Sequence, residues 1–467
     1  MALYSVMTIW YPDPSLIRRP AYLSLADQFA RAIHDGQLPH GTRLPTHRRL
    51  AYDLKLSVQT VSRAYEELIR RGLISGEIGR GSFVQTMRRE VEPPYLPERL
   101  GELIDLSILK PVCEPMHLEK LKEALGWLGA NLPASSGLSF RPNVVFPRHR
   151  TIAVEWLRAC GLAPSQQNIS VTNGATAAMT VALMSVAPPG STVATEAIGH
   201  HTLIPLASYL GFNLHGLAID EQGIIPEALD EACRTSDIRA VFVQPSVINP
   251  TATLMHGVRR SALAEVARRH DIAIIEGDVL GPLVEDRPPP IAYFAPERTL
   301  YYTSFTKITA PGLRIGYLVA PDRYVAAVAN RHLVTNWMAT PIVAEIASKW
   351  VVDGTAMELV HWQRAALARR QTIVKEVLGE GEYLTHPQAL HLWLPLPGSR
   401  TEESFVAQAR LQGVAIAPGA SFRTSDALWL PAVRISLGST TEGELRAGLG
   451  VIARLMMGEP EHLLLAI

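Results

Sequence analysis

One lysine in the second half of the chain has neighbours that suit covalent chemistry with an aldehyde. Lys307 follows the hydroxyl of Ser304 by three residues, and Arg314 comes seven residues after the lysine. A lysine amine condenses with an aldehyde to form a Schiff base, while a hydroxyl and a guanidinium are good ligands for a phosphate. The turn Pro311-Gly312 lies between these groups and can bring them together. The grouping therefore predicts an aldehyde cofactor that carries a phosphate.

The stretch from Ser304 to Tyr317 resembles the cofactor-lysine region of fold-type I pyridoxal-phosphate (PLP) enzymes, the aspartate aminotransferase superfamily. This resemblance implies that Lys307 holds PLP as a Schiff base and that Ser304 and Arg314 bind its phosphate. It also implies an α/β fold with a large mixed-sheet domain and a smaller C-terminal α+β domain. Strand-like runs alternate with helical ones, at Ile169–Thr172, Thr192–Ala194, Ala240–Gln244, Ile272–Glu276, Thr299–Thr303 and Gly316–Val319. This alternation favours the same class, a parallel-rich sheet covered by helices.

The start of one predicted helix adds to the phosphate site. Thr172-Asn-Gly-Ala-Thr-Ala-Ala178 opens a helix directly after a strand. Backbone N–H groups at a helix N-terminus are free to bind an anion. By resemblance, Gly174, Ala175 and Thr176 therefore contribute N–H groups and a hydroxyl to the cofactor phosphate.

Four further positions match residues that surround the cofactor ring and the substrate in this superfamily. The resemblance assigns Asn249 to the phenolic oxygen of the ring, and His200 to stacking on the ring. It assigns Asp278 to the ring nitrogen, where an ionised carboxylate would keep the nitrogen protonated and the ring electron-withdrawing. Arg434 matches the arginine that binds a substrate carboxylate with both nitrogens of its planar fork. For the adjacent His201 we expect an ordinary surface position.

Two positions depart from the superfamily pattern. Residue 280 is a leucine where most relatives have a tyrosine that supports the ring oxygen. Phe140 lies where a tyrosine of the partner subunit often reaches the phosphate. The loss of both hydroxyls would weaken cofactor binding and the proton transfers that turnover needs. These departures favour sensing over catalysis.

The first ninety residues have a different pattern, typical of a small helical unit. Leu25, Phe29 and Ile33 recur at intervals of four and predict a first helix. Thr46 can cap a second helix over residues 47–54, and Ser57 can cap a third. The third helix has an apolar stripe at positions 61, 64, 65, 68 and 69, and a glycine-rich segment to Val84 then reads as two short strands. This order predicts a winged helix-turn-helix.

Residues 20–85 resemble the DNA-binding domain of the GntR family, through Pro45–Ala51, Ser57–Tyr65 and residues 71–84. In that family the third helix enters the major groove and the tip of the wing reaches the minor groove. The candidate DNA contacts are Arg48, Ser57, Gln59, Thr60, Arg63, Gly79, Arg80 and Gly81. Val58 departs from the pattern, because many relatives have an arginine there, so the operator sequence cannot be copied from them.

Composition and charge agree with a soluble chain of two to four domains. Of 467 residues, 47% are apolar and 19% charged, with a net charge of zero. Residues 1–90 nevertheless hold 13 lysines and arginines against 8 acidic residues, so the remainder is net acidic. A basic head on an acidic body fits a nucleic-acid contact at one end of the chain.

The cysteines and the apolar runs bear on location. Cys113, Cys160 and Cys233 are widely spaced and form neither a CxxC pair nor a Cys/His cluster, which argues against a disulfide frame or a metal site. We find no N-terminal signal pattern and no apolar run of eighteen residues. These features predict a cytoplasmic protein with no membrane partner.

Both halves together resemble MocR-type regulators, the GntR subgroup with an aminotransferase-like effector domain. We expect a DNA-binding domain over residues 1–86, a linker over 87–101, and a PLP-binding domain over 102–467 whose small subdomain begins at about residue 330. The resemblance implies a homodimer, commonly head-to-tail, that binds two-part operators in double-stranded DNA and responds to an amino acid or amine.

Three hypotheses follow. In the first, the protein is a PLP-dependent regulator that senses its effector through aldimine exchange at Lys307. In the second, it is an active aminotransferase whose DNA-binding head regulates its own expression. In the third, the protein binds DNA but no longer holds the cofactor, an idea that Leu280 and Phe140 keep open.

Overall fold

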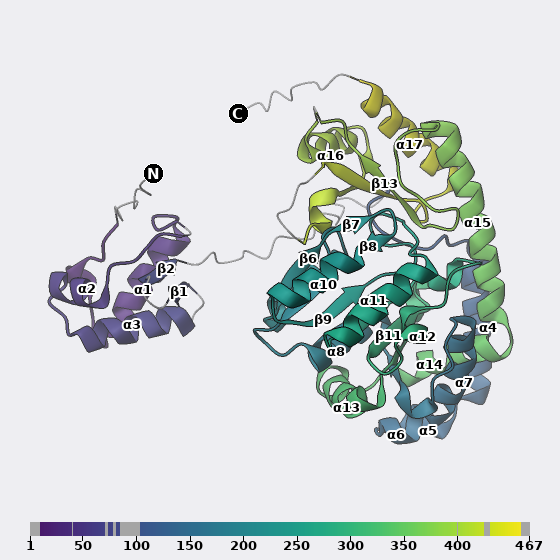
Figure 1. The fold of residues 1–467 in the computed structure, drawn as a ribbon, viewed down its shortest axis with the longest axis horizontal. Coiled ribbons are helices and arrows are strands. Elements are labelled where there is room, and N and C mark those ends of the chain that lie inside the picture. The colour runs from purple at the N-terminus through teal and green to yellow at the C-terminus, as the bar shows by residue number, and fades with distance from the viewer. Residues whose placement is uncertain are drawn as a thin grey trace. The chain divides into compact units, whose positions relative to one another are not determined.

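The computed structural model describes residues 10–39, 41–70, 73–77, 81–84, 103–398, 400–424 and 430–458 (Figure 1). The chain divides into two compact units, one within residues 1–96 and one within residues 97–467. The predicted linker over residues 87–101 lies outside the described residues. Among those described, no helix has the length and apolar character needed to cross a membrane.

The N-terminal unit has the predicted winged-helix order. It contains α1 (Ala21–His34), α2 (His47–Asp53), α3 (Val58–Arg70) and the antiparallel strands β1 (Ile74–Glu77) and β2 (Gly81–Val84). The Thr46 hydroxyl accepts a hydrogen bond from the Arg49 amide at 3.4 Å, and the Ser57 hydroxyl accepts one from the Thr60 amide at 3.0 Å. Both predicted N-caps are therefore confirmed.

The core of this unit comes from the apolar faces of α1 and α3. Leu25 and Phe29 of α1 pack in one cluster with the buried positions of α3, which are Val61, Ala64, Tyr65 and Leu68. The predicted stripe was wrong at its last position, because 47% of Ile69 is exposed. Each helical residue turns the side-chain direction by about 100°, so Ile69 lies at the edge of the stripe and faces solvent.

The larger unit is built on a seven-stranded sheet in the order β4-β12-β11-β10-β9-β5-β6. Strands β6, β5, β9, β10 and β11 run parallel, and β12 is antiparallel to both β11 and β4. Their bounds are β4 (Ile169–Thr172), β5 (Thr192–Glu196), β6 (Asn213–Leu217), β9 (Ile238–Val243), β10 (Ala273–Gly277), β11 (Thr299–Ser304) and β12 (Gly316–Val319). The predicted parallel-rich sheet is confirmed, but the edge strand β6 was not predicted.

Side chains alternate between the two faces of this sheet. On β10, Ala273 and Ile275 pack with α8, whereas Ile274 packs with α11. The first face carries α8 (Gly174–Val186), α9 (Leu203–Leu210) and α13 (Asp322–Asn336). The second carries α10 (Pro226–Thr235), α11 (Gly257–Arg269), α12 (Ile291–Phe294), α4 (Pro115–Asn131), α7 (Pro147–Ala159), α14 (Pro341–Val352) and the first half of α15 (Thr355–Leu378). This alternation determines which residues at the strand ends face the site described below.

A smaller α+β part follows α15, later than the start at about residue 330 that we expected, because α14 and the first half of α15 still pack on the large sheet. Its antiparallel sheet consists of β13 (His391–Pro395), β16 (Ala432–Ser436) and β15 (Ala417–Pro418), with helices α16 (Glu402–Leu411) and α17 (Glu442–Met457). Its core cluster is formed by residues from Ile373 onward and by Leu106 from the start of the larger unit. Leu106 is brought there because β3 (Ile104–Asp105) pairs with β14 (Val414–Ala415). The N-terminal end of the larger unit is therefore built into the smaller sheet region. The remaining short elements are α5 (Ala134–Leu138), α6 (Pro142–Val145), β7 (Ile219–Asp220) and β8 (Gly223–Ile224).

Candidate functional site

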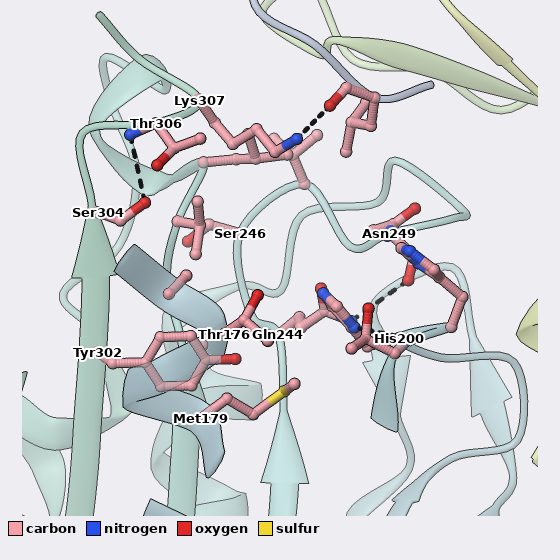
Figure 2. Close-up of a pocket in the computed structure, with 18 of the residues that line it drawn as sticks. Thr176, Met179, His200, Gln244, Ser246, Asn249, Tyr302, Ser304, Thr306 and Lys307 are labelled. Atoms are coloured by element: carbon pink, nitrogen blue, oxygen red, sulfur yellow. Dashed lines mark hydrogen bonds between the residues drawn. The ribbon is translucent and has the colours of Figure 1, made fainter. Parts of the chain in front are cut away.

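A cavity lies where the carboxyl ends of β9, β10 and β11 meet the N-terminus of α8 (Figure 2). Parallel strands that end at one edge of a covered sheet create a crevice there, the usual place for a ligand in such folds. Lys307 lines the cavity together with most of the residues predicted to hold the cofactor: Ala175, Thr176, His200, Asn249, Ser304 and Arg314. Gly174 is not among the lining residues. The fold thus brings residues that are far apart in the sequence together around one lysine.

Lys307 carries an amine prepared for nucleophilic attack. Burial, together with the charges of Arg434 and Arg314, lowers the pKa of Lys307 to about 8. Its Nζ donates a hydrogen bond to the backbone carbonyl of Leu109, as Figure 2 shows at the top of the cavity. About a tenth of the amine is neutral at pH 7, far more than for an ordinary lysine, and the neutral amine is the form that attacks an aldehyde.

Hydroxyl groups beside the lysine form one wall of the cavity. Ser304 is fully buried at the end of β11, and its Oγ accepts a hydrogen bond from the Thr306 amide at 3.3 Å. The Thr306 hydroxyl lines the cavity and has no hydrogen-bond partner within the described part of the chain. A buried hydroxyl is normally paired, so this one is available to bond a ligand in the cavity. Sequence reasoning missed Thr306, although it lies between two of the residues singled out.

Arg314 and the start of α8 also line the cavity. Arg314 has a left-handed backbone with φ of 44°, a conformation that is costly without a glycine and that is concentrated at functional sites. A Cβ placed on Gly174 would lie 3.2 Å from Nη2 of Arg314, so the guanidinium packs directly on the first residue of the helix. Gly174 itself has a φ of +80°, which also favours glycine. The helix N-terminus and the arginine together suit a phosphate.

Arg434 and Asn249 join the smaller sheet to the cavity. Arg434 is buried on β16, and its Nη1 donates to Oδ1 of Asn249 at 2.9 Å. Its Nη2 donates to the carbonyl of Ser107. With Oδ1 of Asn249 bound in this way, its Nδ2 is the atom that can donate to a cofactor oxygen. Asn249 lines the cavity, whereas Arg434 lies behind it.

Two histidines lie at one end of the cavity. The rings of His200 and His201 stack with centroids 5.0 Å apart, and both residues line the cavity. Our expectation of a surface position for His201 was therefore wrong. Burial and the charges of Lys307 and Arg434 lower the pKa of His200 to about 4, and burial also lowers that of His201 to about 2. Both rings are neutral at physiological pH, as suits packing against a cofactor ring.

Asp278 does not lie where the resemblance assigned it, and this corrects the prediction. It is absent from the cavity lining and shares the alternation of Ile274, so it faces the side of the sheet away from α8. Its Oδ2 accepts a hydrogen bond from the Tyr301 hydroxyl at 2.8 Å and forms an ion pair with Arg287. Burial alone would raise the pKa of Asp278, but the charges of Arg287 and Arg260 lower it below its usual value.

The residue that does face the cavity at this point is Gly277. A Cβ placed on Gly277 would lie 2.5 Å from the hydroxyl oxygen of Tyr302, its neighbour on β11. Tyr302 is 3% exposed and lines the cavity, with its ring near Met179 at the lower left of Figure 2. The space beside the strand end thus holds a phenol rather than a carboxylate. Sequence reasoning missed Tyr302.

Both departures from the superfamily pattern are visible. Leu280 lines the cavity with an apolar side chain and offers no hydroxyl. Phe140 is 73% exposed and packs on Trp337, with ring centroids 5.3 Å apart. Phe140 therefore makes no contribution to the cavity of its own chain.

The cavity fits PLP at one end and differs from the expected site at the other. The unpaired Thr306 hydroxyl, Arg314 and the N-terminus of α8 suit a phosphate, and Lys307 has the lowered pKa that Schiff-base formation needs. At the ring-nitrogen end, the carboxylate of Asp278 is absent and the hydroxyl of Tyr302 is present.

In the N-terminal unit, the predicted DNA contacts gather around α2 and the start of α3. Arg48, Gln59 and Arg63 are exposed, and the guanidinium of Arg63 lies 4.1 Å from the centroid of the Tyr22 ring. The hydroxyls of Ser57 and Thr60 are 2.8 Å apart at the α3 N-terminus. Gly81 begins β2 with φ of 115°, whereas Gly79 and Arg80 lie outside the described residues.

Comparison with protein families supports both halves. Residues 135–452 match the family model described as aminotransferase class I and II. Residues 21–84 match the model described as bacterial regulatory proteins, gntR family. The two matches fall within the two compact units.

Similar proteins include transcriptional regulators that match most of the chain and aminotransferases whose structures resemble the larger unit. The HTH-type transcriptional regulator YdeF of Bacillus subtilis is 26% identical over 96% of each chain. The pyridoxine biosynthesis regulator PdxR of Corynebacterium glutamicum is 26% identical, covering 76% of this chain and 78% of its own. The kynurenine aminotransferase of Pyrococcus horikoshii superposes with a TM-score of 0.71 at 21% identity, covering 78% of this chain and 93% of its own. The structural likeness shows the fold.

Proposed function

We propose that this chain, which belongs to the aminotransferase class I and II family and carries a GntR-type DNA-binding domain, is a transcriptional regulator. This combination of domains is that of MocR-type regulators. We propose further that the protein senses an amino compound through bound PLP. PLP is the cofactor of this family, and it supplies an aldehyde carbon that exchanges one amine for another. The observation that carries the proposal is Lys307, with its pKa lowered to about 8, in a cavity with a phosphate-binding wall.

The roles of the individual residues follow from their chemistry. Ser304, Thr306, Arg314 and the N-terminus of α8 bind the phosphate, Asn249 donates to the ring oxygen, and the neutral His200 packs on the ring. With PLP bound, Lys307 would hold its aldehyde carbon, and an effector amine that took this place would leave Lys307 as a free amine that has gained one proton. Arg434 binds a carboxylate of the effector with its planar fork.

We further propose a route by which this exchange reaches the DNA-binding domain. Lys307 donates to the carbonyl of Leu109 and Arg434 to the carbonyl of Ser107, two residues away. This short segment follows the predicted linker in the chain. An effector carboxylate would draw Arg434 away from Ser107, while a displaced Lys307 can donate to Leu109. A differential affinity of about 1–3 kcal/mol between the two arrangements is enough for a useful response.

On the DNA side, we propose that α3 enters the major groove. Gln59 and Arg63 are exposed on this helix and can read base edges, and Ser57 and Thr60 at its N-terminus suit a phosphate. An Arg63→Ala protein should bind its selected operator about tenfold or more weakly. Selection from a random duplex library, followed by titration at fixed salt, measures this effect.

We propose a homodimer as the working assembly, with the head-to-tail arrangement of the subgroup. Exposed apolar side chains support a partner surface on the larger unit, since Leu138, Phe140 and Val334 are 87%, 73% and 84% exposed. Analytical ultracentrifugation of the full chain beside a Phe140→Glu variant tests this assembly. A monomeric parent protein would contradict it.

The decisive experiment is an absorption spectrum of the purified chain with PLP, beside Lys307→Ala, followed by titration with a panel of amino compounds. We expect a visible band that requires Lys307 and shifts with one class of amine, and a promoter response to that amine that is lost in Lys307→Ala. An unchanged response in Lys307→Ala would contradict the sensing role. Sustained transfer of amino groups to a keto acid at ordinary enzyme rates would favour an active aminotransferase with a self-regulating head.

A further inference from the structure

The cavity lining beside Gly277 is formed by a tyrosine whose hydroxyl is available for a ligand. Tyr302 is 3% exposed and lines the cavity, and its hydroxyl forms no hydrogen bond within the described part of the chain. A buried phenol normally finds a partner. Because Gly277 has no side chain, the Tyr302 hydroxyl occupies the position beside the strand end that a side chain at residue 277 would fill.

This hydroxyl stays protonated. Burial, and then the charge of Glu196, raise the pKa of Tyr302 above its usual value, so the phenol is a hydrogen-bond donor at physiological pH. The cavity-lining residues within the described ranges include no carboxylate. Glu196 is fully buried behind the lining and accepts hydrogen bonds from the Gln244 amide at 3.0 Å and the Thr195 hydroxyl at 2.9 Å. The charged groups at the cavity are the cations Lys307 and Arg314.

We propose that Tyr302, in place of an acidic residue, is the partner of the PLP ring nitrogen, donating its hydroxyl proton to a nitrogen that carries no proton. The inference rests on the PLP binding proposed above. A protonated ring nitrogen would need an acceptor and a compensating negative charge, and this cavity offers a donor and two cations instead.

The consequence separates exchange from turnover. Replacement of the lysine amine by the effector's amine moves one proton and leaves the ring electrons in place. Completed amino-group transfer also removes a proton from the effector's α-carbon, and the electron pair left behind must be drawn into the ring. An unprotonated nitrogen draws this pair weakly. Tyr302 therefore lets the cavity recognise an amine while slowing the reaction that would consume it.

The test is nitrogen NMR of the full chain loaded with ring-¹⁵N PLP. A protonated ring nitrogen resonates far upfield of an unprotonated one, so the signal reports the proton directly. For the parent protein, we expect the ring-nitrogen signal at the chemical shift of an unprotonated nitrogen. In Tyr302→Phe, the loss of one hydrogen bond should weaken PLP binding about fivefold to tenfold. Tyr301→Phe is the matched control, because its hydroxyl binds Asp278 on the other face of the sheet and should leave the signal unchanged.

Two more variants keep the inference falsifiable. Asp278→Asn should leave the nitrogen signal in place, provided that thermal unfolding shows a folded protein. Gly277→Asp combined with Tyr302→Leu supplies a carboxylate and removes the phenol, and should move the signal upfield and speed the loss of the effector's α-proton. A parent signal at the protonated position, or one that moves with Asp278→Asn, overturns the inference while the proposed function stands. Failure to form any Lys307-dependent band overturns both.

Discussion

The two ends of the cavity around Lys307 differ in the chemical groups that they offer to a cofactor. The phosphate end has a helix N-terminus, an arginine and two hydroxyls, whereas the ring-nitrogen end has a glycine and a phenol. Binding energy for PLP comes mainly from the charged phosphate contacts, while its reactivity depends on the group beside the ring nitrogen. Because separate side chains provide the two functions, the group beside the ring nitrogen could change, as proposed here, while the phosphate contacts stay in place.

The largest effect is expected from Lys307→Ala, which removes the residue shared by both ends. The visible band and the effector response should vanish completely, because no other amine lines the cavity within the described residues. Absorption spectroscopy and a promoter assay measure the two losses. Lys349→Ala is a suitable control, since Lys349 forms an ion pair with Asp353 away from the cavity.

Asp278→Asn separates the fold from the ring-nitrogen end. The substitution leaves the buried Arg287 without its ion-pair partner and should cost about 3–5 kcal/mol of unfolding free energy. Urea denaturation measures that cost. At a temperature where the variant is folded, its PLP spectrum should equal that of the parent. Loss of the visible band there would show that Asp278 contacts the ring nitrogen after all.

Arg314→Ala tests the phosphate end alone. Loss of a charge-assisted contact of about 2–3 kcal/mol should weaken PLP binding by about thirty- to a hundredfold. Fluorescence titration with PLP measures the affinity. Pyridoxal, which has no phosphate, should bind the parent and the variant about equally, and a similar loss for pyridoxal would show that Arg314 acts elsewhere.

The smallest expected effect is a pH dependence of cofactor attachment. Because the pKa of Lys307 is lowered to about 8, its neutral fraction rises about tenfold per pH unit below that value and levels off above it. The rate of appearance of the visible band, followed by stopped flow from pH 6 to 9.5, should follow this curve. A rate that still rises tenfold per pH unit up to pH 9.5 would mean that the pKa of Lys307 is not lowered.

Much of the architecture could be predicted because it depends on local patterns. The Thr46 and Ser57 caps, and the bounds of β4 and β12, follow from hydrogen-bonding side chains and apolar runs. Strand β6 was missed because Asn213 and Gly216 are poor strand formers, and its pairing with β5 decides its structure.

The meeting of Ser304, Lys307 and Arg314 at one cavity could be predicted in the same way, but the residue that faces the cavity at the end of β10 could not. Asp278 is one residue from the position that faces the cavity, and a shift of one residue in a strand exchanges the two faces of the sheet. Alternation counted from Ile275 would have pointed to Gly277. The role of Tyr302 depends on its pairing with Gly277 across two strands, which no single segment reveals.

In the proposed sensing scheme, the hydrogen bonds of Lys307 and Arg434 to the carbonyls of Leu109 and Ser107 would let the cavity distinguish two classes of ligand. A plain amine would free Lys307 to bond Leu109 and leave Arg434 on Ser107, so the segment would have both attachments. An amino acid adds a carboxylate that competes for Arg434 and releases one of them. Amino acids should then act as full agonists and simple amines as partial ones, with the difference in maximal response set by one guanidinium.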